Sequence, residues 1–359
     1  MKIGIVFCNE LNVCPYVDKY ISILNEKNIE YDYILWNRSN IKKDYPENYL
    51  VYSEHSELHV QKYKKIGAFF RFAKYANKVI IDNNYDKLII LTSLPAVFCY
   101  KLLVGKYKGK YIFDFRDLSF EKNLIFRYML KQIIYNSYFT CISSPGFEEV
   151  LPKYDYTTSH NFQYKHLMSN KVESFNKNSI IRLLHIGIAR GEEYNKKLAD
   201  IFGNDSRFIV NIVGNGNDTE SFKKYILKYK NINVHGTYDN VDKEKYINDA
   251  DVLLYYYPCG FNNNRALANK YYDGIIFKKP LVGNSNTYSG KRLMSKNLGI
   301  SLELDDGQFA NKLYSYYSTL DFNEFYYCAN IELNNILEED RIYCKKIEEF
   351  LNIRRDDYE

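Results

Sequence analysis

The chain has 359 residues, 46% of them hydrophobic and 26% charged, with a formal net charge of +5. That length suits two domains of ordinary size, and the composition excludes a disordered or fibrous protein. No apolar run reaches the roughly 20 residues of a membrane-spanning helix. The seven cysteines are scattered without a C-x-x-C pair, so neither a disulfide framework nor a zinc site is indicated. The start, MKIGIVFCNE, is typical of a first strand rather than a signal peptide, and we expect a cytoplasmic protein.

Short apolar runs and amphipathic stretches alternate along the first half of the chain. The apolar runs predict strands at 2–8, 31–36, 87–92, 111–115 and 138–143. Between them, helices are predicted at 17–28, 61–81, 96–106, 124–136 and 146–154. Helices that separate successive strands indicate βαβ units, and therefore a parallel sheet with helices on both faces.

The same alternation restarts near residue 180. Strands are predicted at 181–188, 208–213, 232–235, 252–257, 280–282 and 300–304, again with helices between them. The fold class is therefore α/β, with two Rossmann-like doubly wound domains facing a central cleft. We expect an N-terminal domain at 1–157, a polar linker at 158–178, a C-terminal domain at 179–330 and a charged helix at 331–359. That last helix either crosses back onto the first domain or caps the second.

Ligands of open parallel sheets bind beyond the carboxyl ends of the strands, so the turns after the predicted strands are the candidate sites. The second domain opens with LLHIGIARGEEYNKK, where a strand ends at Gly187 and Arg190 and Lys196 follow. Glycine permits close approach of the backbone, and cations at this edge would suit a diphosphate. Solvated charges at an ordinary turn are the alternative.

A second glycine turn follows the next predicted strand. In IVNIVGNGNDTESFKK, Gly214 and Gly216 precede a helix that Asp218 or Thr219 would cap. The stretch lacks the third glycine and the downstream acid of the dinucleotide fingerprint. Taken alone, it predicts only a turn.

The most specific stretch is GFNNNRALANKYYDGIIFKKPLVGN, at 260–284. Asn269, Lys270 and Asp273 fall at i, i+1 and i+4 of a predicted helix, so all three can face one side. The helix N-terminus and Lys270 suit a diphosphate, while Asp273 can accept hydrogen bonds from two ribose hydroxyls. A solvated helix face with a Lys270–Asp273 ion pair is the alternative, and the context favours ligand binding.

This stretch resembles the donor-binding segment of GT-B glycosyltransferases, especially the retaining family 4 group, in which an Asn-Lys pair, an acid and a later Lys-Pro recur in that order. LLHIGIARG resembles the opening of that family's C-terminal domain, FIVNIVGNG its central strand and glycine turn, and INVHGTYDN its turn beside the nucleobase. INDADVLLYYYP resembles the strand before the donor motif, and SHNF the hinge segment. YIFDFRDL resembles the Asp-x-Arg-Asp turn of lipopolysaccharide- and capsule-type relatives.

The resemblance implies a glycosyltransferase that takes sugar from a nucleotide-sugar donor, UDP- or GDP-linked, and needs neither a cofactor nor a metal. The acceptor would be a saccharide or a lipid-linked saccharide in the synthesis of a bacterial surface polysaccharide. A GT-B-type nucleotide-sugar epimerase is one alternative. A non-catalytic nucleotide- or sugar-binding protein is the other.

The resemblance also implies roles for single residues. The donor would contact Gly187, Arg190, Lys196, Gly214, Gly236, Tyr238, Asn264, Asn269, Lys270 and Asp273. Asp273 would bind the ribose, Arg190 and Lys270 the diphosphate, and residues 236–238 the base. The family has a further acid eight residues before the ribose acid. Here that position is Arg265, so we expect altered recognition of the sugar, and the resemblance gives weaker support for retention of configuration.

In the first domain, Asp114, Arg116 and Asp117 follow the strand at 111–115 and would point into the cleft. A carboxylate there can orient an acceptor hydroxyl or act as a general base, and Asp117 is the preferred catalytic residue. The alternative is a salt bridge through Arg116 that fixes the turn.

Other charged features of the sequence bear on metal, membrane and nucleic-acid binding. Asp249 and Asp251 form a D-x-D pair, but a helix end and a strand start explain them, and the histidines lack metal-ligand spacing. Residues 61–81 interleave Lys and Arg with aromatic residues, as in a helix lying on an anionic membrane. An ordinary helix covering the sheet is the alternative. No motif for binding nucleic acid accompanies these residues, so nucleic acid is not an expected partner.

Overall fold

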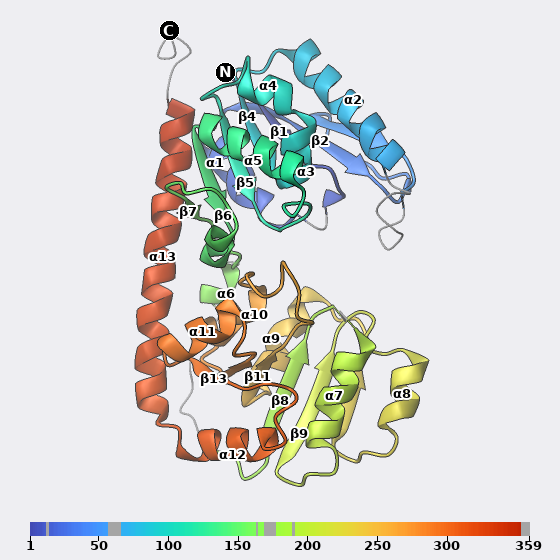
Figure 1. Ribbon diagram of the computed structural model, residues 1–359, viewed down its shortest axis with the longest axis vertical. Coiled ribbons are helices and arrows are strands. Elements are labelled where there is room, and N and C mark those ends of the chain that lie inside the picture. The colour runs from blue at the N-terminus through green and yellow to red at the C-terminus, as the bar shows by residue number, and fades with distance from the viewer. Residues whose placement is uncertain (12–13, 57–65, 163, 169–176, 189–190, 353–359) are drawn as a thin grey trace. The chain divides into compact units, whose positions relative to one another are not determined.

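The computed structural model describes the chain except for residues 12–13, 57–65, 163, 169–176, 189–190 and 353–359 (Figure 1). The chain divides into two compact units. Unit 1 comprises Met1–His160 and Glu339–Glu359, and unit 2 comprises Asn161–Glu338. Each unit is built on a parallel sheet flanked by helices.

Unit 1 contains a seven-stranded sheet in the order β3-β2-β1-β4-β5-β6-β7. Its strands are β1 (Lys2–Val6), β2 (Glu30–Asn37), β3 (Tyr49–Ser53), β4 (Lys87–Leu91), β5 (Tyr111–Phe115), β6 (Phe139–Ile142) and β7 (Thr157–Thr158). The central strands are mainly apolar because both of their faces are covered, and every residue of β4 is buried. β3 is a partly exposed edge strand and β7 has only two residues, so neither was predicted from the sequence.

The helices of unit 1 follow the expected alternation with two differences. They are α1 (Val17–Glu26), α2 (Ile66–Asn83), α3 (Ser93–Phe98), α4 (Tyr100–Val104), α5 (Leu124–Asn136) and the 3-10 helix η3 (Pro145–Glu149). The single helix predicted at 96–106 is two short helices, which meet at Cys99, a residue outside the helical region. The helix predicted at 146–154 is only the short η3.

Unit 2 contains a six-stranded sheet in the order β10-β9-β8-β11-β12-β13. Its strands are β8 (Ile181–Ile186), β9 (Phe208–Val213), β10 (Ile232–His235), β11 (Val252–Tyr255), β12 (Leu281–Gly283) and β13 (Gly299–Ser301). Its helices are α6 (Lys165–Met168), α7 (Glu192–Phe202), α8 (Glu220–Ile226), α9 (Asn240–Asn248), α10 (Asn269–Ile276), α11 (Tyr288–Ser295) and α12 (Phe309–Thr319).

Both sheets begin with the strand order 3-2-1-4-5-6, which is that of a doubly wound fold. The predicted α/β class with two Rossmann-like domains is therefore confirmed. The order reverses between β1 and β4 in unit 1, and between β8 and β11 in unit 2. Such sheets bind ligands at the carboxyl ends of the strands beside this switch point. The loops after these strands are therefore where sites are expected.

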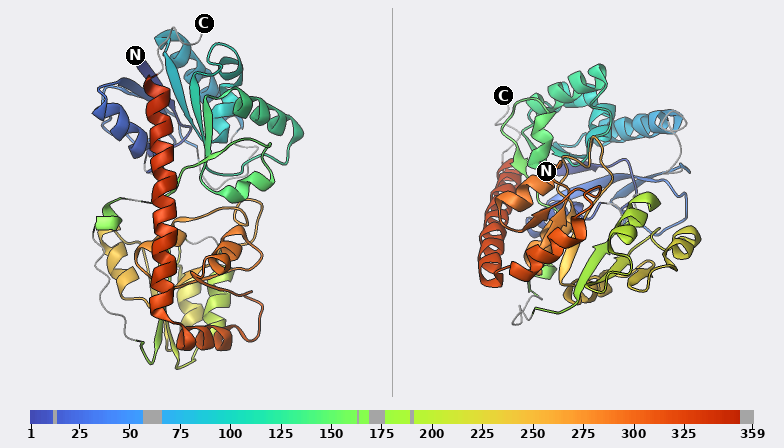
Figure 2. Two further views of the ribbon diagram at one scale, coloured as in Figure 1. Left: turned by 90° about the vertical axis from the view of Figure 1, so that its left-hand side faces the viewer. Right: turned by 60° about the horizontal axis from the view of Figure 1, so that its bottom comes forward.

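The last helix, α13 (Phe322–Asn352), belongs to both units (Figure 2). The sequence predicted that this helix begins at residue 331, whereas it begins at Phe322. Its residues from Glu339 onward belong to unit 1. There Tyr343, Ile347 and Phe350 are buried in the apolar core of unit 1. No helix within the described ranges is long and apolar enough to cross a membrane.

Candidate donor site

Two glycine turns meet beside the switch point of unit 2, after the neighbouring strands β8 and β9. Gly187 follows β8 and Gly214 follows β9, and both have a φ of +129°, which favours glycine. A Cβ atom on Gly214 would lie 2.0 Å from the carbonyl oxygen of Gly187. Only glycine therefore allows the two turns to approach this closely. The stretch that the sequence predicted as a simple turn is packed against the first candidate turn.

Two buried asparagines hold these turns together. Asn217 Nδ2 donates hydrogen bonds to the carbonyl oxygens of Gly187 (2.9 Å) and Val213 (3.2 Å). Asn195 Nδ2 in α7 donates in turn to Asn217 Oδ1 (2.8 Å). Sequence reasoning missed both residues, because an asparagine in a turn or a helix is common and its partners lie far away in the chain.

Lys270, in the first turn of α10, lies beneath the first glycine turn. Its Nζ is 3.2 Å from His185 Nδ1, 3.3 Å from the Leu254 carbonyl oxygen and 4.8 Å from the centre of the Tyr257 ring. Burial, followed by the charge of Lys270, holds the pKa of His185 well below its usual value, so the imidazole is neutral. These contacts orient the ammonium group, whose charge also acts on the nearby carboxylate of Asp273.

Asp273 lies one turn further along α10 and is also buried. Its carboxylate forms an ion pair with Lys243 Nζ of α9 at 2.7 Å. Burial raises the pKa of Asp273, while the charge of Lys243, chief among its cationic neighbours, opposes this rise. Lys270 and Asp273 are only 3% and 5% exposed, so the alternative of a solvated helix face is excluded.

The neighbour of Lys270 fixes α10 from its buried side. Tyr271 donates its hydroxyl hydrogen to Glu332 of α13 (2.7 Å), and Arg292 of α11 donates to the same carboxylate (2.6 Å). All three residues lie in unit 2. This hydrogen-bonded ion pair sets the position of the helix that carries Lys270 and Asp273.

The remaining predicted donor residues lie around this centre. Asn264 Oδ1 accepts the backbone N–H of Gly260 (2.8 Å), which orders the loop before α10. Asn269 is exposed, and its Oδ1 accepts from Asn161 Nδ2 (2.6 Å). Tyr238 is half-buried, and the negative charge of Asp273 adds to burial in raising its pKa, which indicates that the two groups are near each other.

Three further predicted residues have different outcomes. A Cβ on Gly236 would lie 2.8 Å from Asp218 Oδ2, so this glycine permits a close approach of its turn. Lys196 is held at 3.0 Å by both Glu192 and Glu193 and would have to leave them to contact a diphosphate. Arg190 lies outside the described residues.

In unit 1, Asp114 and Arg116 of the predicted acceptor turn are buried and bonded to each other. Arg116 donates from Nε and Nη2 to the two carboxylate oxygens at 2.6 and 2.7 Å, and Tyr20 donates its hydroxyl hydrogen at 2.9 Å. Arg116 also donates to the hydroxyl of Ser159 (2.7 Å). The alternative of a salt bridge through Arg116 that fixes the turn is thus present in the structure. Asp117, the next carboxylate, is exposed.

The chain is similar to known proteins in structure rather than in sequence. No family model matches the chain, and no curated protein matches its sequence. The apo form of the lipopolysaccharide outer core galactosyltransferase WaaB has a TM-score of 0.63 at 14% identity, covering 98% of this chain and 99% of that chain. An E. coli structure described as trehalose-6-phosphate bound with UDP-2-fluoro glucose has a TM-score of 0.68 at 9% identity, covering 99% and 100%. WaaG, a glycosyltransferase involved in lipopolysaccharide biosynthesis, has a TM-score of 0.56 at 11% identity, covering 96% and 95%.

This chain has the GT-B fold. Within it, Asp249 is the C-cap of α9, and buried Asp251 is structural because it accepts hydrogen bonds from Arg182 Nη2 (3.0 Å) and Asn178 Nδ2 (2.8 Å). Across the described part of the chain, no group of three or more His, Cys, Asp or Glu side chains is arranged to hold a metal ion.

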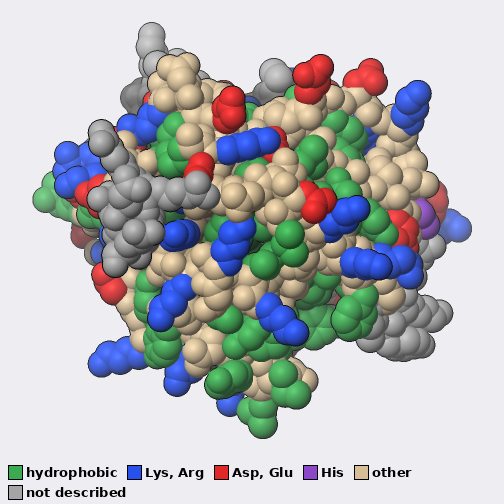
Figure 3. Space-filling model, turned by 90° about the horizontal axis from the view of Figure 1, so that it is seen from above, with side chains coloured by type: hydrophobic (Ala, Val, Ile, Leu, Met, Phe, Trp, Pro, Cys, Tyr) green, Lys and Arg blue, Asp and Glu red, His purple; other side chains and the backbone are tan. Residues whose placement is uncertain are grey.

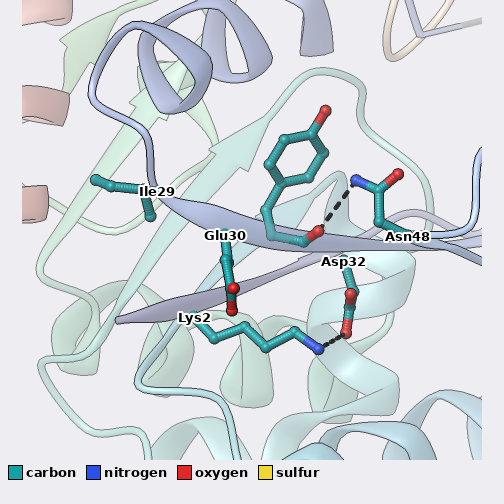
Figure 4. Close-up of a pocket in the computed structure, with 6 residues that line it drawn as sticks. Lys2, Ile29, Glu30, Asp32 and Asn48 are labelled. Carbon is teal, nitrogen blue, oxygen red and sulfur yellow. Dashed lines mark hydrogen bonds and ion pairs between the residues drawn. The ribbon is translucent and has the colours of Figure 1, made fainter.

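A hollow of about 380 Å³ in unit 1 of this GT-B chain lies away from the expected sites (Figure 4). It is lined by Lys2, Ile29, Glu30, Tyr31, Asp32 and Asn48. Lys2 pairs with Asp32 at 2.7 Å, and Asn48 Nδ2 donates to the Tyr31 carbonyl oxygen at 3.1 Å. Lys2 and Glu30 begin β1 and β2, so the hollow is at the amino edge of the sheet, opposite the edge that binds ligands.

Proposed function

We propose that this chain is a glycosyltransferase that moves a sugar from a nucleotide-sugar donor to a saccharide acceptor. The observation that carries the proposal is a buried cation and a buried carboxylate, Lys270 and Asp273, near the start of one helix at the switch point of a GT-B fold. Burying ionisable groups is unfavourable, so their presence in a prospective ligand site supports a binding role.

The diphosphate of the donor would lie against the two glycine turns. Gly187 and Gly214 carry no side chain that would keep a phosphate from the backbone, and Lys270 supplies positive charge from below. We also propose that no metal takes part, because this buried ammonium group can stabilise the charge on a diphosphate leaving group. The UDP-2-fluoro glucose bound in the similar E. coli structure supports a donor linked to UDP, and GDP is the other base considered.

The ribose would bind at Asp273 and the base beside Tyr238. A carboxylate has two oxygens that can each accept a hydrogen bond from a ribose hydroxyl. The ion pair with Lys243 favours the ionised form that this contact requires. Tyr238 is half-buried near Asp273 and offers an aromatic face to the base.

Unit 1 would supply the acceptor groups. Asp117 follows β5 at the carboxyl edge of its sheet, is exposed, and is our proposed general base. Asp114 and Arg116 would hold the turn that presents it. The names of WaaB and WaaG refer to lipopolysaccharide, which supports an acceptor of surface polysaccharide synthesis, such as a lipid-linked saccharide. We also propose that the enzyme is cytoplasmic.

We further propose that the protein contacts an anionic membrane surface, but chiefly through α5 rather than through residues 61–81. Residues 61–65 lie outside the described ranges. In α2, Phe72 is buried against Trp36, and Phe69 also contacts that ring, so much of the aromatic character of this helix faces the core. Phe70 is the exposed exception.

In α5, by contrast, Leu124, Ile125 and Tyr128 are 70%, 72% and 60% exposed. No acid occurs from residue 122 to residue 147, and Arg127 and Lys131 are exposed on the same helix. Figure 3 shows hydrophobic and basic side chains mixed over the lower part of this face of unit 1. Apolar side chains beside cations suit the interface of an anionic bilayer.

The membrane proposal is tested with vesicles that contain anionic lipids. Changing Leu124, Ile125 and Tyr128 together to Ser should weaken sedimentation with the vesicles, while Phe70→Ser serves as the matched control on α2. Binding that is insensitive to the triple change but lost in Phe70→Ser would assign the contact to α2.

The proposed activity is tested by incubating the full chain with UDP- and GDP-sugars, with and without saccharide acceptors, and identifying the products. Acceptor-dependent formation of a new glycosidic bond supports a transferase. Acceptor-independent change of the donor sugar would indicate an epimerase. Donor binding without any product across the acceptor panel would favour the non-catalytic alternative.

A further inference from the structure

A buried arginine at the carboxyl edge of unit 1 has no role in the site described above. Arg38 directly follows β2 and is 7% exposed. Its Nη2 donates to the Ser56 hydroxyl at 3.2 Å, whereas its buried Nε has no hydrogen-bond acceptor among the described residues. Arginine carries five N–H donors and is seldom buried unless it is paired.

No nearby acid neutralises this guanidinium within the described structure. Glu10 is the carboxylate whose charge acts on it, but that side chain is held by Lys43 at 2.8 Å and by the backbone N–H of Ser39 at 2.7 Å. Cys8 also lies close, and burial raises the pKa of its thiol to about 12, so the thiol is uncharged. Glu10 and Lys43 offset each other, so the positive charge of Arg38 itself is left without a carboxylate of its own among these groups.

Aromatic rings restrict the direction from which a partner can approach. The Arg38 guanidinium carbon lies 4.9 Å from the centre of the Trp36 ring and 5.5 Å from that of Phe69. Such contacts hold the planar group firmly. The N–H donors lie in that plane, which is the geometry in which arginine binds the oxygens of a phosphate or a carboxylate.

We propose that Arg38 binds an oxyanion of the acceptor, either a phosphate or a carboxylate. This inference rests on the proposed transferase function and specifies the acceptor class. Arg38 follows β2 and Asp117 follows β5, with β1 and β4 between these strands. At about 4.8 Å per strand spacing, the two positions are roughly 14 Å apart along the sheet edge. The acceptor is therefore an extended anionic saccharide whose charged group is remote from the hydroxyl that receives the sugar.

The test measures the binding of inorganic phosphate and of glucuronate to the full chain by calorimetry. UDP is present at saturation, and the titrations are repeated in Lys270→Gln, so that binding at the donor site is excluded. Arg38→Met keeps the length of the apolar stem and should weaken binding of the preferred anion at least tenfold. Arg71→Met, which removes an exposed arginine paired with Glu54, is the matched control and should bind like the wild type.

Arg38→Lys keeps the charge but not the planar fork, and its melting temperature shows whether the fold survives. In the wild type, the preferred anion should raise the melting temperature, and this increase should be lost in Arg38→Lys. Preference for phosphate or for glucuronate identifies the anion. The proposal is overturned if neither probe binds, or if Arg38→Met binds as tightly as the wild type. A wild-type chain that binds the anion but does not bind UDP would instead contradict the proposed donor site.

Discussion

The proposed acceptor turn of unit 1 and the proposed donor helix of unit 2 both place an aspartate close to a cation in sequence, but the charges in the two elements have different partners. In unit 1, Asp114 and Arg116 are two residues apart and bond to each other through two short contacts. In unit 2, Lys270 and Asp273 are three residues apart, yet Lys270 contacts neutral His185 and Asp273 pairs with Lys243 from another helix.

The comparison shows that burial and residue type alone do not identify a ligand site. A carboxylate that accepts hydrogen bonds from two arginine N–H groups and a tyrosine hydroxyl has little remaining capacity for a ligand. Asp114 therefore supports the structure of its turn. Lys270 contacts a neutral imidazole, a carbonyl oxygen and an aromatic ring, and its charge also acts on Asp273 of the same helix. The partner of each charge, which the sequence does not reveal, decides between structural support and binding.

The largest effect is expected at the exposed carboxylate of the acceptor turn. Asp117→Asn should lower the turnover rate by roughly 10²–10⁴-fold, which is the usual contribution of a general base. Donor affinity and melting temperature should change little, because Asp117 is exposed and belongs to unit 1. Steady-state kinetics with a donor and acceptor identified in the product screen measures the effect.

Asp155→Asn, another exposed aspartate of unit 1, provides the matched control for this loss. Normal turnover in Asp117→Asn would remove that residue as the base. A lowered melting temperature with a mild, mixed kinetic loss would instead indicate that Asp117 supports the turn.

Breaking the buried pair in the same turn should act on stability. Asp114→Ala leaves Arg116 buried without its carboxylate, and the free energy of unfolding should fall by about 3–5 kcal/mol. Denaturant unfolding of the intact chain, monitored by circular dichroism, measures this difference. Stability equal to that of the wild type would show that the ion pair does not fix the turn and would reopen a catalytic role for Asp114.

A smaller effect, on the pH dependence of nucleotide affinity, is expected when Lys243, the ion-pair partner of Asp273, is replaced. Burial raises the pKa of Asp273 and the charge of Lys243 opposes that rise, so Lys243→Met should raise the pKa further. Only the ionised carboxylate accepts both ribose hydroxyls. Affinity for a nucleoside diphosphate should therefore fall as the pH decreases, and in Lys243→Met this fall should begin at a higher pH. Identical pH profiles of the dissociation constant would refute the coupling.

Much of the fold could be predicted because buried parallel strands are distinctive in sequence. The runs 111–115, 208–213 and 232–235 coincide with β5, β9 and β10, since each strand is mainly apolar and contains only one or two polar residues. The edge strand β3, YLVYS, carries the same signal although the sequence analysis did not predict it, whereas the two-residue β7 is too short to show one. The interruption at Cys99 between α3 and α4 was missed because the segment has neither a central glycine nor a central proline to mark it.

The candidate site was only partly predictable for a related reason. Lys270 and Asp273 stood out because their spacing on one helix is visible in the chain. Lys243 and Asn217 did not, because each acts on a residue that is distant in sequence, 30 residues away in both cases. Whether a charge is already paired depends on such long-range contacts, which no local pattern contains.

The proposed metal-independent donor site at Asp273 is tested most directly by the affinity of the intact chain for UDP and GDP, measured by calorimetry in the wild type and in Asp273→Ala. For whichever nucleotide binds, we expect Asp273→Ala to lose about 1–3 kcal/mol of binding free energy, which is the range for a lost hydrogen bond to a charged group. EDTA should leave the wild-type affinity unchanged. Equal affinity in the two proteins, or binding abolished by EDTA, would contradict a metal-independent donor site built on Asp273.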